Sequence, residues 1–256
     1  MKLAFAGKGG VGKTTLAALF ARFLADSHRR VIAIDCDPDA NLSQALGFGE
    51  DIVPVSKMKE LIHERMEIKN NDPTYFKLNP KIDDIPEKYL KKDGELYLMA
   101  MGGVDVAGTG CICPESRFVK NLLEHMVMRS EDNLIMDMEA GIEHLGRSTA
   151  KSVDALVAVV EPSVFSLNTL DKIKKLAPQI GINTLKVIAN KIRTQDEERF
   201  IMEKVPKDLL LGTILYTPEL SKVIGSGYLK SDEMLFRRIE GFIKTFEEEL
   251  SNGQKK

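Results

Sequence analysis

The chain has 256 residues, with 36 Lys and Arg against 38 Asp and Glu, a formal charge of −2 and only three Cys. Near-neutral charge gives no electrostatic reason to expect a nucleic-acid partner, and three cysteines are too few for a disulfide scaffold. The apolar run at the N-terminus is too short for a signal peptide. A membrane span needs about 18 consecutive apolar residues, and every apolar run in this sequence is much shorter. We therefore expect a cytoplasmic protein with neither a membrane nor a nucleic-acid partner.

Short apolar runs alternate with segments of helical period, which is the pattern of an α/β fold with a mostly parallel central sheet and helices on both faces. The expected strands, in chain order, are residues 3–6, 31–34, 134–136, 155–160, 185–189 and 209–215. Helical spacing of apolar residues marks 16–24, a patch near 58–66, and 235–250, whose apolar face we expect to pack on the sheet. Residues 1–250 are predicted to form one domain with an insertion at about 50–94, followed by a flexible tail at 251–256.

A glycine-rich loop, GKGGVGKTT at 7–15, follows the first expected strand and opens the first expected helix. It matches G-x-x-x-x-G-K-[ST], which predicts a P-loop NTPase that binds ATP with Mg²⁺. Backbone N–H groups of such a loop face phosphate oxygens, Lys13 is expected to reach the β- and γ-phosphates, and the Thr14 hydroxyl is expected to bind Mg²⁺. The residues expected to contact the nucleotide here are Gly9, Gly10, Val11, Gly12, Lys13, Thr14 and Thr15.

A second lysine, Lys8, stands at the entrance of the same loop. It is either a solvated loop residue or a group that reaches a nucleotide held by a second copy. The run GKGGVGKTT resembles the deviant Walker A loop of a family that includes ParA- and Min-type ATPases, the nitrogenase iron protein and nickel-inserting maturation ATPases. This resemblance implies a homodimer that encloses ATP and a catalytic role for Lys8, beside Lys13, at the partner's nucleotide.

Carboxylates follow two of the expected strands, Asp35 and Asp37 after the second and Asp137 after 134–136. Open α/β sheets bind ligands at these carboxyl ends. Asp137 is placed as a Walker B acid, and it heads a segment, 138–145, that we expect to act as a switch. The family resemblance implies that Asp37 positions the attacking water, while Asp35 and Asp137 support Mg²⁺ through water. Asn190 follows another strand, and the resemblance implies that its amide binds the adenine edge; otherwise it helps a turn.

Two cysteines, Cys111 and Cys113, are separated by one residue in a Gly- and Pro-flanked loop. Thiolates are soft ligands that suit nickel, zinc, copper(I) or iron–sulfur clusters. Two thiolates cannot complete a four-coordinate site, but a two-fold dimer brings four together if the loop lies on its axis. Free thiols and a strained disulfide are the alternatives.

The combination of these segments resembles the CooC-type ATPases that mature carbon monoxide dehydrogenase. That resemblance implies that Cys111 and Cys113 of two subunits bind Ni²⁺ and that ATP hydrolysis drives its delivery to the apo-enzyme. Zn²⁺ fits the same ligands, so nickel rests on the resemblance alone. Cys36, inside the DCDPD segment, departs from the small residue more usual there.

Three other functions remain open from the sequence. The client could be acetyl-CoA synthase, whose site also contains nickel. The four thiols of a dimer could instead hold an iron–sulfur cluster, as in an ATP-dependent reductase resembling the nitrogenase iron protein. A positioning ATPase that binds DNA or membrane is disfavoured by the net charge and by the Glu247-Glu248-Glu249 run at the end of the last helix.

Overall fold

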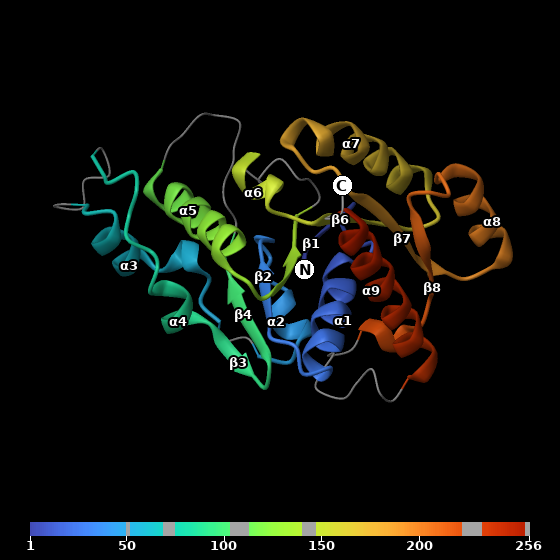
Figure 1. The fold of residues 1–256 in the computed structure, drawn as a ribbon, viewed down its shortest axis with the longest axis horizontal. Helices are drawn as coiled ribbons and strands as arrows, with labels where there is room; N and C mark the ends of the chain where they lie inside the picture. Colours follow the sequence, from blue (N-terminus) through green and yellow to red (C-terminus); the bar gives the residue numbers. More distant parts are fainter. Residues whose placement is uncertain (50–51, 69–74, 103–112, 140–146, 222–231, 254–256) are drawn as a thin grey trace.

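The computed structural model describes residues 1–49, 52–68, 75–102, 113–139, 147–221 and 232–253. Within them, eight strands form one sheet in the order β3-β4-β2-β5-β1-β6-β7-β8 (Figure 1). All neighbouring strands are parallel except the β3–β4 pair. The strands are β1 (Lys2–Ala6), β2 (Val31–Asp35), β3 (Lys91–Asp93), β4 (Leu96–Ala100), β5 (Asn133–Asp137), β6 (Ala155–Val160), β7 (Leu185–Ile192) and β8 (Leu210–Leu215).

Helices cover both faces of this sheet, which confirms the predicted fold class. The longer ones are α1 (Lys13–Asp26), α5 (Pro114–Arg129), α7 (Val164–Ile180), α8 (Gln195–Lys204) and α9 (Glu233–Gly253). Shorter turns are α2 (Leu42–Ala45), η1 (Val55–Lys57), α3 (Lys59–Arg65), α4 (Ile85–Tyr89), α6 (Arg147–Lys151) and η2 (Pro218–Ser221). Buried residues of α1 and α9 share one core layer, and those of α5 and α7 share the other.

Side-chain alternation along β1 explains why the molecule has two core layers. Leu3 and Phe5 point into the layer under α1 and α9, while Ala4 and Ala6 point into the layer under α5 and α7. Because both faces of a central parallel strand are covered, its sequence is a continuous apolar run rather than an alternating one. The same reason makes every residue of β6 buried.

The C-terminal helix α9 packs through its apolar face, as the sequence predicted. Ile239, Phe242 and Phe246 are buried, and α9 lies beside α1 (Figure 1). The helix continues to Gly253, so the first residues of the expected tail are helical. Among the described residues, no helix combines the length and the apolar content that a bilayer span requires.

The antiparallel β3–β4 hairpin is a feature that the sequence analysis missed. β3 lies inside the segment expected to be an insertion, yet it extends the sheet at its edge. Gly94 turns the hairpin with a φ of +60°, and the buried guanidinium of Arg22 on α1 donates to Asp93 at 2.8 Å. The available signal was the Asp93-Gly94 pair followed by the apolar run of β4.

Candidate functional site

The glycine-rich loop joins the carboxyl end of β1 to the start of α1, as predicted. Gly12 precedes α1 with a φ of +97°, a left-handed conformation that favours glycine. A Cβ added at Gly12 would lie 2.4 Å from Nδ2 of Asn190, so the loop and β7 are in close contact there. The first N–H groups of a helix have no partner within the helix, so those of α1 can bind an anion above the loop.

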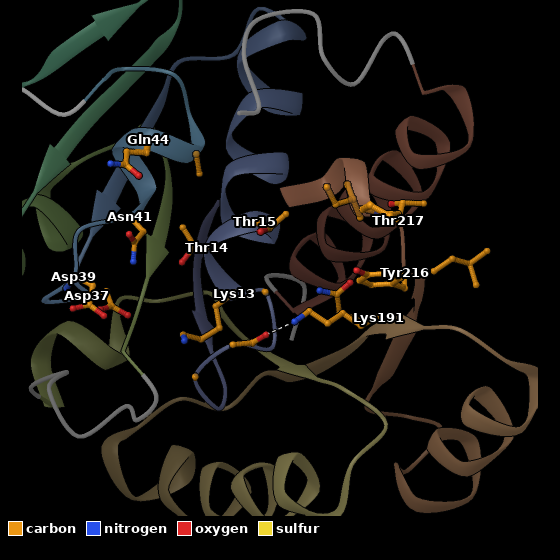
Figure 2. A pocket seen from close by; sticks show the side chains of 18 residues that line it. Lys13, Thr14, Thr15, Asp37, Asp39, Asn41, Gln44, Lys191, Tyr216 and Thr217 are labelled. Atoms are coloured by element: carbon orange, nitrogen blue, oxygen red, sulfur yellow. Dashed lines mark hydrogen bonds between the residues drawn. The ribbon is translucent and has the colours of Figure 1, made fainter. Parts of the chain in front are cut away.

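A cavity of about 570 Å³ opens above this loop, a size that suits a nucleotide. Figure 2 shows Asp37 and Asp39 at one side of Lys13, with Tyr216 and Thr217 at the other. Four segments, far apart in sequence, line the cavity. The lining residues are Gly9, Gly10, Gly12, Lys13, Thr14, Thr15, Asp37, Asp39, Asn41, Gln44, Ala45, Asn190, Lys191, Leu215, Tyr216, Thr217, Pro218 and Leu220.

Two carboxylates lie side by side at the ends of β2 and β5, where Asp35 and Asp137 are paired in register. Both are fully buried. The Asp35 carboxylate accepts the backbone N–H groups of Leu42 at 2.9 Å and Asp37 at 3.1 Å. Burial nevertheless raises the pKa of Asp35 to about 6, because these two bonds only partly replace the lost hydration.

Asp137 is less well satisfied than Asp35. No hydrogen bond of good geometry reaches either of its carboxylate oxygens from the described residues, although the Thr14 hydroxyl lies near enough to lower its pKa. Burial raises its pKa to about 7, against the opposing influence of the Thr14 hydroxyl and the Lys13 ammonium nearby. A buried, unpaired carboxylate is costly unless a cation or its water shell completes it. This environment fits Mg²⁺ held at Thr14 with Asp137 behind its water.

The other predicted catalytic groups differ in exposure. Lys13 is 6% exposed, and the half-buried Asp37 accepts the Asp39 N–H at 3.0 Å, a local turn that holds its carboxylate at the cavity. Lys8 is exposed and does not line the cavity; its ammonium lies 5.7 Å from the ring centroid of Phe165, the second residue of α7. Among the described residues, Lys8 is thus not part of the cavity lining of its own chain.

Two of the predicted nucleotide contacts take part in the structure of the loop itself. The side chain of Val11 is buried in the core, so only its backbone could contact a phosphate. Asn190 is 4% exposed, and its Nδ2 donates to the Val11 carbonyl at 2.8 Å. The neighbouring Lys191 donates through Nζ to the Gly10 carbonyl.

Cys36 and Cys113 lie outside the cavity lining. Cys113 immediately precedes α5, where its sulfur accepts the Ser116 N–H at 3.4 Å and lies 3.0 Å from Ser116 Oγ. Cys111 and the switch segment from residue 140 onward fall outside the described residues. Within those that are described, no group of three or more His, Cys, Asp or Glu could hold a metal ion. Burial and the nearby carboxylates of Asp35 and Asp137 raise the pKa of Cys36 well above that of an ordinary thiol.

One end of the cavity was missed by sequence reasoning. Tyr216, Thr217, Pro218 and Leu220 follow β8 and line the cavity, and Figure 2 shows Tyr216 and Thr217 on the side away from Asp37. Their signal was a Thr-Pro turn directly after an expected strand, the position at which polar residues of such sheets meet ligands.

Comparison with known proteins defines the class to which this site belongs. Residues 3–229 match the family model of the CobQ/CobB/MinD/ParA nucleotide binding domain, so the chain belongs to this family of P-loop ATPases. The chain is 44% identical over 218 residues, 84% of its length and 83% of the relative's, to the carbon monoxide dehydrogenase accessory protein CooC of Rhodospirillum rubrum. The resemblance to CooC-type ATPases inferred from the sequence is thereby confirmed.

One further relative and one solved structure are also similar to this chain. An uncharacterised ATP-binding protein of Methanocaldococcus jannaschii is 42% identical over 232 residues, 90% of this chain and 89% of that one. The structure of the cell division protein MinD of Aquifex aeolicus superposes with a TM-score of 0.63 at 24% identity, covering 95% of both chains. The latter likeness establishes the fold alone.

Proposed function

We propose that this chain is an ATP-driven metal carrier that binds nickel between two copies of itself and inserts it into carbon monoxide dehydrogenase. The observation that carries the proposal is that one chain joins an ATPase cavity to the Cys111–Cys113 pair, at 44% identity to an accessory protein of that enzyme. Neither feature alone would distinguish a carrier from a positioning ATPase.

The residues that line the cavity would have different roles in ATP hydrolysis. Lys13 and the loop N–H groups hold the phosphates, and Asp37, at the Lys13 side of the cavity, orients the attacking water. Thr14 would hold Mg²⁺, with Asp35 and Asp137 acting through its water shell, and the ion would neutralise phosphate charge. The nucleoside would extend toward Asn190, Tyr216 and Thr217.

Lys8 is the residue that would make the reaction depend on a dimer. Its ammonium is exposed and lies outside the cavity of its own chain, which supports a contact with the nucleotide of a second copy. Adding this positive charge at the partner's phosphates stabilises the charge that develops during phosphoryl transfer. ATP binding would then close the dimer, and hydrolysis would loosen it.

The metal is the cargo of this cycle. Two thiols per chain supply half of a four-coordinate site, so a closed dimer would offer four thiolates and an open dimer only two. Loss of two ligands weakens any divalent ion's site, which couples hydrolysis to release. Cys113 caps the N-terminus of the 16-residue helix α5, which is anchored in the core through Phe118, Leu122 and Met126 and so gives a metal ligand a rigid support.

Nickel stoichiometry in cysteine variants tests this function. The full chain, freed of metal, is titrated with Ni²⁺ in the presence of a non-hydrolysable ATP analogue, as wild type and as Cys113→Ser, Cys111→Ser and Cys36→Ser. We expect half an equivalent per chain in the wild type and in Cys36→Ser, and none in the other two. Unchanged nickel binding by Cys113→Ser would place the site elsewhere, and a stoichiometric iron–sulfur spectrum of the chain as purified, before metal removal, would favour a reductase.

The client and the compartment belong to the same proposal. We propose that the carrier acts in the cytoplasm and that its client is carbon monoxide dehydrogenase. Nickel transfer to the apo form of this enzyme and to apo acetyl-CoA synthase, measured side by side, distinguishes the two clients. We expect the nickel-loaded carrier to restore the activity of carbon monoxide dehydrogenase and not that of acetyl-CoA synthase.

A further inference from the structure

Two consecutive side chains near the end of β7 hold two consecutive carbonyls of the phosphate loop. Asn190 Nδ2 donates to the Val11 carbonyl at 2.8 Å, and the Lys191 ammonium donates to the Gly10 carbonyl, as the dashed line in Figure 2 marks. Asn190 is buried at 4% exposure, so its bond is shielded from water.

This arrangement departs from ordinary strand geometry. Successive side chains of a strand point to opposite faces, so residues 190 and 191 should not reach the same loop. Two local features remove the alternation. Lys191 has a φ of +61°, the left-handed region, and the β7–β8 register shifts between Ala189 and Ile192. A left-handed residue other than glycine is strained and persists only where its surroundings hold it.

The consequence for the loop follows from the planar trans peptide. A carbonyl and the N–H of the next residue point in opposite directions, so a carbonyl drawn toward β7 turns the following N–H away from β7. Holding the Val11 carbonyl thus orients the N–H of Gly12, which lines the cavity. Without these bonds the loop peptides can rotate, and a carbonyl turned toward the cavity would repel phosphate.

We propose that Asn190 and Lys191 form a clamp that fixes the phosphate loop in its phosphate-accepting conformation before the nucleotide arrives. They act as positioning residues through the loop backbone. The inference rests on the proposed binding of ATP phosphates by this loop. The strained conformation of Lys191 is what allows both bonds to form from adjacent positions.

The clamp is tested in the nucleotide-free protein by rapid-quench hydrogen exchange of the segment 7–12. Asn190→Ala and Lys191→Met should each accelerate exchange there by about 5-fold, while Lys191→Arg should restore the wild-type rate. The matched control is Lys186→Met, which removes another β7 lysine that donates to a backbone carbonyl, that of Asp208, at 3.2 Å. Wild-type exchange in both clamp variants would overturn the proposal.

Affinity measurements separate the clamp from a direct contact with the ligand. Inorganic tripolyphosphate and ADP should both bind about 5- to 10-fold more weakly to Asn190→Ala and Lys191→Met. A loss for ADP alone would indicate a base contact, and a loss with unchanged loop exchange would indicate a direct phosphate contact; either result would refute the clamp. A wild type that binds neither ligand would refute the proposed function instead, while the exchange experiment still decides on the clamp.

Lys191→Gly distinguishes positioning from general stabilisation. Glycine adopts the left-handed conformation without strain but cannot reach the Gly10 carbonyl. We expect a midpoint of urea unfolding equal to or above that of wild type, together with the same 5- to 10-fold loss of tripolyphosphate affinity as in Lys191→Met. Wild-type affinity in this variant would contradict the clamp.

Discussion

Adding a methyl group at Gly12 should damage the phosphate loop more than adding one at Gly10, although both glycines have a positive φ, +97° and +82°. Left-handed alanine costs roughly 1–2 kcal/mol at either position. The surroundings differ: a Cβ at Gly10 would meet nothing within 4 Å, whereas a Cβ at Gly12 would lie 2.4 Å from Asn190 Nδ2. Gly10→Ala is therefore a matched control for the backbone strain.

The extra cost at Gly12 comes from the displacement of a buried amide. Relief of the overlap requires Asn190 to move, which adds overpacking strain of about 1–3 kcal/mol. The same movement breaks its 2.8 Å bond to the Val11 carbonyl, which contributes roughly 1 kcal/mol. Gly12→Ala should therefore be less stable than Gly10→Ala by about 3 kcal/mol, or roughly 6–12 °C in the midpoint of thermal unfolding for a chain of this size.

The two alanine variants are compared without nucleotide, by urea and thermal unfolding, so that contacts with phosphate do not contribute. Double variants that also carry Asn190→Ala provide the internal test. Once the amide is removed, the difference between Gly12→Ala and Gly10→Ala should fall to within about 0.5 kcal/mol. Equal stability of the two single variants, or a difference that persists in the double variants, would refute the assigned contact.

Three further predictions concern the carboxylates and Lys8. Burial raises the pKa of Asp35 to about 6 and that of Asp137 to about 7, so the folded, metal-free protein keeps protons that the unfolded chain releases near pH 4. The free energy of unfolding should therefore fall as the pH rises from about 4 to 8. The fall should be smaller in Asp137→Asn, which has lost one of the two titrating groups. Urea titrations across this range would contradict the assignment if wild type were more stable at pH 8 than at pH 5. Asp37→Ala should slow steady-state ATP hydrolysis by at least about 100-fold with ADP affinity within about 2-fold, whereas Asp196→Ala on the surface of α8 should leave both unchanged; equal hydrolysis by Asp37→Ala would exclude its role. Lys8→Ala should retain ADP affinity but lose the dimer formed with a non-hydrolysable ATP analogue, and light scattering that still detects this dimer would argue against a contact across the interface.

The sequence predicted those parts of the fold that depend on local pattern. The continuous apolar runs identified the central strands because both of their faces are buried, and the phosphate-loop motif located the start of α1. Asp37 and Asp137 were found because polar residues at strand ends are conspicuous between apolar runs. The β3–β4 hairpin was missed because β3, Lys91–Asp93, is entirely charged and exposed.

Other parts of the site depend on contacts that no local pattern encodes. The left-handed conformation of Lys191 occurs where the register between β7 and β8 shifts. The sequence of β7 alone does not predict this shift. The bond from Asn190 to the Val11 carbonyl joins residues 179 apart in sequence. The cavity side at Tyr216 and Thr217 likewise exists only because β8 pairs with β7 and brings the following turn over the loop.

Molar mass and nickel content, measured together with and without nucleotide, show whether nickel is held between two chains. The full chain is loaded with Ni²⁺ and separated by size-exclusion chromatography with light scattering and elemental analysis, in a non-hydrolysable ATP analogue, in ADP and without nucleotide. We expect a two-chain species carrying one nickel ion in the ATP analogue, and loss of that nickel in ADP or in the variant with both Cys111→Ser and Cys113→Ser. Nickel that elutes with a single chain, or that stays bound in the double cysteine variant, would contradict the proposed function.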